Sequence, residues 1–161
     1  MSKQVLALTL GVLAVLSIGL MLFMQSNKKV HLVLDARMQK VRVQEVDPNR
    51  TIVVLDFRVT NPAEVLYRVK NVEVLLTTAE GEQLKGTIAA EMDTEQIFAA
   101  YPALGQKFNQ SFISREALEG GKTIDRMIAA SFDAPLKAIE GRKGLLLRIQ
   151  EIDGLITEVT Q

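Results

Sequence analysis

The sequence of 161 residues contains no cysteine, no tryptophan and only one histidine, His31. Without cysteine the chain can form no disulfide, no cysteine-based zinc site, no lipid-modified cysteine and no cysteine nucleophile. A metal site or general base built on histidine would depend on His31 alone, because no second histidine can pair with it. These absences exclude several classes of enzyme and metalloprotein, and we predict no cofactor and no metal.

An excess of basic charge is missing as well. Residues 25–161 hold 18 of the 19 lysines and arginines and all 19 aspartates and glutamates, and the whole chain has a formal net charge of zero. Electrostatic binding to DNA or RNA needs a basic surplus that displaces counterions from the phosphates. We therefore predict that nucleic acid is not a partner.

Sequence motifs of common catalytic sites are also absent. The chain has no Gly-x-Ser-x-Gly, no His-Glu-x-x-His, no Walker or dinucleotide glycine pattern and no Asp-x-Asp-x-Asp calcium loop. Two carboxylates can still converge in a fold for general acid and base catalysis, which leaves an envelope hydrolase open as an alternative. The favoured prediction is a protein that is not an enzyme.

A long apolar run is present near the amino terminus. Residues 5–24 contain no charged residue and sixteen apolar residues out of twenty. A helix of this length extends about 30 Å, which matches the hydrocarbon core of a bilayer. The run is longer than the apolar part of a typical signal peptide and lacks an Ala-x-Ala-like site, which favours an uncleaved anchor. We predict a transmembrane anchor over residues 1–27 and one folded domain over residues 28–161, with membrane lipid as a partner.

Small residues recur within this apolar run. Ala7, Gly11 and Ala14 succeed one another at spacings of four and three. Such a stripe lets another helix approach closely and is a candidate helix-packing surface. It supports an alternative function, a small accessory subunit held in a larger membrane complex through its helix. Ordinary alanine and glycine content in a spanning helix is the competing interpretation.

The charges flanking the run give conflicting information about orientation. Lys3 precedes it, whereas Lys28 and Lys29 lie just after it, and a literal positive-inside count places the domain in the cytoplasm. A short lysine-bearing tail before an apolar run is, in contrast, typical of chains that export their downstream domain. We predict an inner-membrane protein with a single span and an extracytoplasmic, periplasmic domain.

The domain begins with the alternating pattern of β-strands. Apolar residues alternate from Val30 to Met38 and then change phase, which predicts a β-bulge or a break between two strands near residues 39–40. A turn is predicted at residues 47–50, and residues 51–60 form a strand with one buried face, Val53, Leu55, Phe57 and Val59. Residues 69–78 and 83–89 form the next two strands, joined by a turn at Glu80-Gly81.

A change of period then predicts a short helix. Asp93 is a candidate N-cap, and Pro102 and Gly105 end the helical pattern. Its apolar face consists of Ile97, Phe98, Tyr101 and Leu104. We expect this face to cover the open end of a β-sandwich, and a partner-binding face is the alternative.

The remaining strands complete a mainly β fold. Strands are predicted at residues 108–113, 123–132, 144–152 and 155–159, with Asp153-Gly154 as a type I′ hairpin turn. Seven or eight short strands and one inserted helix indicate a β-sandwich.

A short motif at the end of the second strand resembles a known family. The motif consists of residues 57–62, which end in Asn61-Pro62, followed by Val69, Val72 and Val74 and then by Glu80-Gly81 and Gly86. It resembles the core of the late embryogenesis abundant type 2 (WHy) domain. Ala63 departs from the family pattern, which often has a second asparagine there. The resemblance implies an immunoglobulin-like or fibronectin-like sandwich without an enzymatic site, linked to stress protection or the cell envelope. From the residues themselves, Asn61 and Pro62 end a strand for structural reasons.

The sequence therefore predicts a non-enzymatic, single-pass, membrane-anchored β-sandwich. Its expected role is an interaction module or a stress-related component of the cell envelope, with a protein partner in the membrane or envelope.

Overall fold

The computed structural model describes Ser17 and residues 33–161. The predicted anchor apart from Ser17, the Ala7, Gly11 and Ala14 stripe and His31 lie outside the described residues. In the part of the chain that is described, no helix has the length and apolarity needed to cross a membrane.

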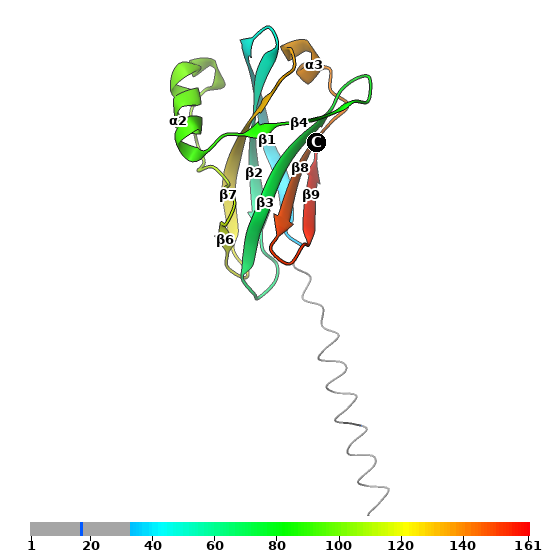
Figure 1. The fold of residues 1–161 in the computed structure, drawn as a ribbon. Helices are drawn as coiled ribbons and strands as arrows, with labels where there is room; N and C mark the ends of the chain where they lie inside the picture. Colours follow the sequence, from blue (N-terminus) through cyan, green and yellow to red (C-terminus); the bar gives the residue numbers. More distant parts are fainter. Residues whose placement is uncertain (1–16, 18–32) are drawn as a thin grey trace, which may run out of the picture. The chain divides into compact units, whose positions relative to one another are not determined.

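Two antiparallel sheets make up the domain (Figure 1). The first has the order β1-β2-β7-β5, formed by Asp35–Asp47, Arg50–Thr60, Thr123–Phe132 and Thr87–Ile88. The second has the order β4-β3-β8-β9, formed by Gln83–Lys85, Tyr67–Thr77, Gly144–Glu151 and Ile156–Thr160, and the short β6, Ala117–Leu118, also pairs with β3. The predicted mainly β, sandwich-like architecture is confirmed, with nine strands among residues 33–161 instead of seven or eight.

Alternating apolar side chains on β2 explain how the two sheets pack against each other. Val53, Leu55, Phe57 and Val59 are completely buried between the sheets, as the sequence pattern predicts. The Phe57 ring meets Phe112 edge to face with 5.4 Å between ring centroids. Burial of this apolar area is the main source of stability for such a sandwich.

The predicted bulge in β1 is confirmed. The pairing of β1 with β2 shifts register between Met38 and Lys40. One extra residue on β1 keeps the inner face apolar, because Met38 before the bulge and Val41 after it both pack against the core.

The chain changes sheets at Gly86. The sequence predicted one strand over residues 83–89, but β4 pairs with β3 in the second sheet and β5 pairs with β7 in the first. The Gly86 amide donates to the Val74 carbonyl at 2.8 Å. A Cβ at this position would lie 2.8 Å from Cζ of Phe132 and 2.9 Å from Cβ of Ala130. Only a residue without a side chain fits where the backbone crosses the core.

Replacing Gly86 with alanine is expected to destabilise the domain by about 1–3 kcal/mol, because the new methyl group overpacks the core beside Phe132. Urea unfolding followed by circular dichroism measures the change. Gly144→Ala is the matched control, since a Cβ at Gly144 meets no atom within 4 Å. Equal midpoints for the two variants would contradict the close-packing argument.

The helical insertion between β5 and β6 differs in part from its prediction. Helix α2 spans Glu91–Ala100 and is followed by a 3-10 turn, η1, at Pro102–Leu104. The N-cap is Ala90 without a side-chain cap, so the Asp93 prediction was wrong. Thr94 instead donates its hydroxyl to the Ala90 carbonyl at 2.8 Å. A second short helix, α3, spans Leu136–Glu140.

Two local predictions nearer the carboxy terminus were also wrong. Residues 108–113 form only an isolated bridge, in which Ser111 pairs with Met127. This segment also contacts the helix of the insertion, because the Ser111 amide donates to Glu91. The turn between β8 and β9 spans residues 152–155, and only Gly154 has a positive φ, 94°. A type I′ turn requires positive φ at both central residues, so that assignment fails.

Candidate interaction surface

The outer face of the first sheet is divided into a covered half and an open half. The insertion packs on the covered half, where a small apolar cluster is buried apart from the main core. Its members are Ile52, Val54, Leu104, Met127 and Ala129. The face of β2 that the sequence pattern predicted to be exposed is therefore buried at these positions.

An ion pair locks the insertion to this half of the sheet. Arg42 on β1 donates from Nη2 to Asp56 Oδ2 on β2 at 2.7 Å, and both side chains are less than one-tenth exposed. Arg42 Nη1 donates to the carbonyls of Leu104 and Gln106, each at 2.9 Å. Asn109 donates to the second oxygen of Asp56 at 3.1 Å. The guanidinium thus joins a strand to the segment after η1.

The predicted partner-binding face of the helix lies against this cluster. Leu104 is buried, and the half-buried Ile97, Phe98 and Tyr101 pack on it. The centre of the Arg42 guanidinium lies 4.9 Å from the Phe98 ring centroid. Figure 1 shows α2 alongside the sheet that contains β7, so the expectation that the helix covers an open end of the sandwich was wrong.

Glu91, the first residue of α2, joins the helix to the segment of the insertion that contains Lys107 and Ser111. Its carboxylate accepts a hydrogen bond from the Ser111 amide at 2.8 Å and a short one from Lys107 Nζ. Partial burial raises the pKa of Glu91, but the hydrogen bonds from Lys107 and Ser111 outweigh it and hold the pKa at about 2. The charged form of Glu91 therefore stabilises the folded insertion.

The stability supplied by Glu91 is expected to depend on pH. Because its pKa is lower in the folded state, the contribution is fully present above about 4.5, its unfolded value, and is lost as pH falls toward 2. The side chain is 40% exposed, so we expect a loss on the order of 1 kcal/mol after solvent screening. Urea unfolding of the wild type and Glu91→Gln at pH 7 and pH 3 measures it. The difference between them should shrink at pH 3, and it should be near zero at both pH values for the exposed control Glu95→Gln.

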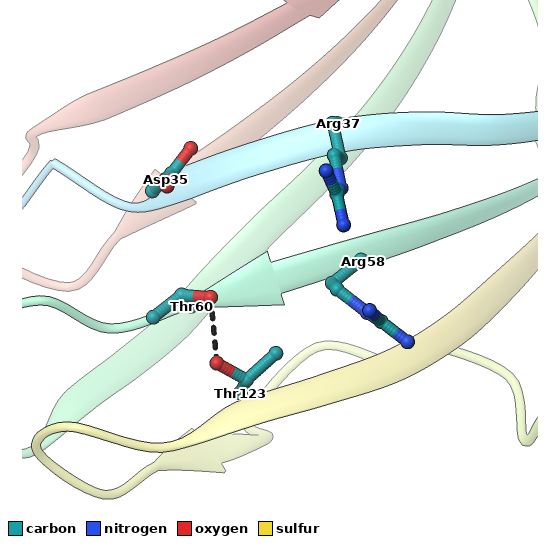
Figure 2. Close-up of a pocket in the computed structure, with 5 residues that line it drawn as sticks. All are labelled: Asp35, Arg37, Arg58, Thr60 and Thr123. Atoms are coloured by element: carbon teal, nitrogen blue, oxygen red, sulfur yellow. Dashed lines mark hydrogen bonds between the residues drawn. The ribbon is translucent and has the colours of Figure 1, made fainter.

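The open half carries a polar hollow of about 380 Å³, lined by Asp35, Arg37, Arg58, Thr60 and Thr123 (Figure 2). Arg37 and Arg58 are direct cross-strand neighbours on β1 and β2. The hydroxyls of Thr60 and Thr123 share a hydrogen bond of 2.8 Å. Within the described residues Arg37 makes no hydrogen bond or ion pair, which leaves one guanidinium available to a partner.

The charges around this hollow balance one another. Arg58 binds Asp125 through two parallel hydrogen bonds of 2.7 Å. These hydrogen bonds from Arg58 lower the pKa of Asp125, and the charge of Arg37 lowers it further. With Asp35 present, two arginines face two carboxylates, so the hollow suits an uncharged polar or mixed partner surface better than a strong anion site.

A second hollow lies along the seam between the two sheets. It has a volume of about 390 Å³ and is lined by residues 36–39 of β1, residues 158–160 of β9 and the following Gln161. Both strands are at the edges of their sheets, so their outer backbone groups have no strand partner. Arg37 lines this hollow and the first one. We call residues 35–39 with both hollows the β1 edge surface.

Asn61, the centre of the family-like motif, is completely buried. Its side-chain amide donates to the carbonyls of Val65 at 2.8 Å and Leu118 at 3.0 Å, and its Oδ1 accepts from the Ala63 amide at 3.1 Å. Its backbone pairs with Gly121 and Lys122, while the neighbouring Pro62 is exposed. Asn61 thus joins the β2–β3 loop to the β6–β7 region, which agrees with a structural role.

The remaining acidic residues do not gather into a metal site within the described residues, where no group of three possible ligands occurs. Sequence reasoning missed the Arg42 and Asp56 pair and the β1 edge surface. Asp56 on a strand with apolar neighbours on both sides was the available signal for a buried charge.

Comparisons with known proteins give a fold likeness only. No family model and no curated protein matches the chain, so the resemblance to the late embryogenesis abundant type 2 domain stays a prediction. An uncharacterized β-sandwich protein from Clostridium difficile 630 aligns at a TM-score of 0.42 with 7% identity, over 80% of this chain and 85% of that one. The archaellum periplasmic stator protein FlaG from Sulfolobus acidocaldarius aligns at 0.38 with 12% identity, over 80% and 98%. The FlaF and FlaG stator complex aligns at 0.37 with 12% identity, over 85% and 92%. These scores are low and carry no functional conclusion.

Proposed function

We propose that this protein is a non-enzymatic, membrane-anchored interaction module that binds a protein partner of the cell envelope through the β1 edge surface. Residues 5–24 supply the anchor, and the sandwich lies outside the cytoplasmic membrane. Its sheets have the strand order of immunoglobulin-like sandwiches, with β4 as an added strand beside β3, which supports that finer fold assignment.

The observation that carries the proposal is an edge strand with an open hollow on each side. Residues 35–39 pair with β2 along one edge and have no strand along the other, where β9 lies beyond the seam hollow. An extended segment of a partner can add to such an edge, with backbone hydrogen bonds giving affinity and side chains entering the hollows. Arg37 is placed to pair with an acidic or carbonyl group of that segment.

Photo-crosslinking in intact membranes tests this assignment. A photoreactive residue at Gln39 or Thr160 of the full chain should give one discrete adduct with a protein partner. Asn71, exposed on β3 of the second sheet, is the control position and should give none. Adducts at Asn71 alone, or turnover of a substrate by the purified chain, would count against the proposal.

A carboxy-terminal reporter pair tests the proposed topology. One reporter is active only in the cytoplasm and the other only outside it. Activity of the outside reporter is expected, and activity of the cytoplasmic reporter alone would make scaffolding at the cytoplasmic face the preferred function. If the anchor instead mediates assembly through its small-residue stripe, Gly11→Leu should release the chain from its complex while the sandwich stays folded.

A further inference from the structure

One end of the sandwich concentrates the exposed apolar side chains of the domain. Six of the nine large apolar residues that are exposed among residues 33–161 lie there. They are Val33, Val65, Leu66, Ile152, Leu155 and Ile156, each between 41% and 57% exposed. They come from the start of the described domain, the β2–β3 loop, and the β8–β9 turn with the first residue of β9, and Figure 1 shows these segments side by side at the end opposite α3. We call this the N-proximal end.

The strand pairing fixes these segments to the same end. Three strand ends are level with one another in the first sheet. Thr60 at the end of β2 pairs with Asp35 at the start of β1 and with Thr123 at the start of β7. In the second sheet Val69, near the start of β3, pairs with Glu151 at the end of β8. The Leu34 amide donates to Thr157 Oγ1 at 3.0 Å and joins the incoming chain to β9. The segments that carry the apolar residues therefore meet at one end of the domain.

The sequence places this end close to the uncharged apolar run. Residues 25–32 separate the run from Val33, and eight residues span at most about 28 Å even when fully extended. The eleven residues of β2 alone extend about 36 Å along the sandwich. With residues 5–24 in a bilayer, the linker keeps Val33 within about 28 Å of the lipid surface, and the distal end lies roughly one strand length further from Val33.

We propose that the N-proximal end docks into the interfacial region of the bilayer, with Leu66, Ile152 and Leu155 entering the boundary between headgroups and acyl chains. This inference rests on the membrane anchor of the proposed function and adds a defined orientation. The sandwich stands end-on, and the β1 edge surface begins close to the lipid.

The chemistry of this end fits a lipid interface whose lipids are zwitterionic. Apolar side chains on loop tips gain free energy when they leave water for the interfacial zone. Charged residues of the same segments include Asp35, Glu64, Arg68 and Asp153, and Glu119 pairs with Lys122 in the adjoining β6–β7 turn. These residues carry no basic surplus, so we attribute the contact of this end to its apolar side chains and not to attraction between these residues and anionic headgroups.

The absence of cysteine allows a direct test with the full chain. Leu66→Cys and Leu155→Cys carry a polarity-sensitive fluorophore after reconstitution into phosphatidylcholine vesicles, with Asn49→Cys in the β1–β2 turn and Gln83→Cys on β4 as exposed controls at the other end of the sandwich. We expect blue-shifted emission at positions 66 and 155 and at least a twofold loss of intensity with lipids that carry a quencher near the headgroup. The two control positions should show neither change.

The outcomes separate the orientation from the anchor. A chain that floats with the vesicles but whose labels at 66 and 155 behave like that at 49 overturns the docking inference alone. Shielded labels that the lipid quencher does not affect also overturn it, because a second copy or another protein then covers this end. A full chain that fails to float overturns the anchor and the inference with it. Circular dichroism confirms folding, and Ile152→Cys replaces either variant that unfolds.

Discussion

Arg42→Ala is expected to destabilise the domain by about 3–5 kcal/mol, because removal of one partner leaves Asp56 as an uncompensated buried charge. The variant also loses the hydrogen bonds to the carbonyls of Leu104 and Gln106, so the insertion is released from the sheet. Urea unfolding at neutral pH measures the free energy of unfolding. Near-ultraviolet or aromatic NMR signals of Phe98 report the release of the insertion.

Arg58→Ala is the matched control for Arg42→Ala. It removes an arginine from the neighbouring strand β2, and its ion pair with Asp125 has equally short distances. The Arg58 side chain is 40% exposed, so its loss should cost only about 0–1 kcal/mol. A similar cost for both variants would show that burial does not govern these pairs. A double variant, Arg42→Met with Asp56→Leu, should recover much of the loss, because no unpaired charge remains.

Asn61→Ala is expected to cost roughly 2–4 kcal/mol, because three hydrogen bonds are lost and the carbonyl of the buried Leu118 loses its side-chain donor. The β2–β3 loop should also lose its fixed position against Leu118. Urea unfolding measures the cost, and hydrogen exchange at the Ala63 amide should become faster.

Asn71→Ala is the control for Asn61→Ala. Asn71 is exposed and makes a single long side-chain contact of 3.4 Å with Glu73, so the change should stay within about 0.5 kcal/mol. Unchanged stability of Asn61→Ala together with loss of a partner would instead assign the motif a binding role.

Local patterns predicted the parts of this fold that depend on local geometry. The inner face of β2, the bulge beside Gln39 and the turn at residues 47–50 are consequences of alternation and turn chemistry, and the structure contains them. Each of these features is decided by residues close together in the sequence. For the same reason, the end of β2 at Asn61 and Pro62 could be predicted.

Features that depend on distant segments could not be predicted. Residues 83–89 have the pattern of one strand. The structure divides them between the two sheets at Gly86, where Phe132 and Ala130 lie too close to leave room for a Cβ. Arg42 and Asp56 have the spacing of solvent-facing residues, and a segment about fifty residues further along the chain buries them. The β1 edge surface depends on the position of β9, which is the last strand in the sequence and far from β1 along the chain.

The insertion has consequences for how the domain opens. The apolar cluster beneath the insertion is separate from the main core. Hydrogen bonds of Arg42 and Glu91 hold the insertion in place at the edge of this cluster. Such a unit can detach while the sandwich stays intact, at a free energy well below that of global unfolding. Amides of α2 should then exchange faster than those of β2, and each opening bares an apolar strip around Val54 and Met127. Acid weakens the hydrogen bonds of Glu91, so the insertion should open more often at low pH and this apolar strip should be exposed more often.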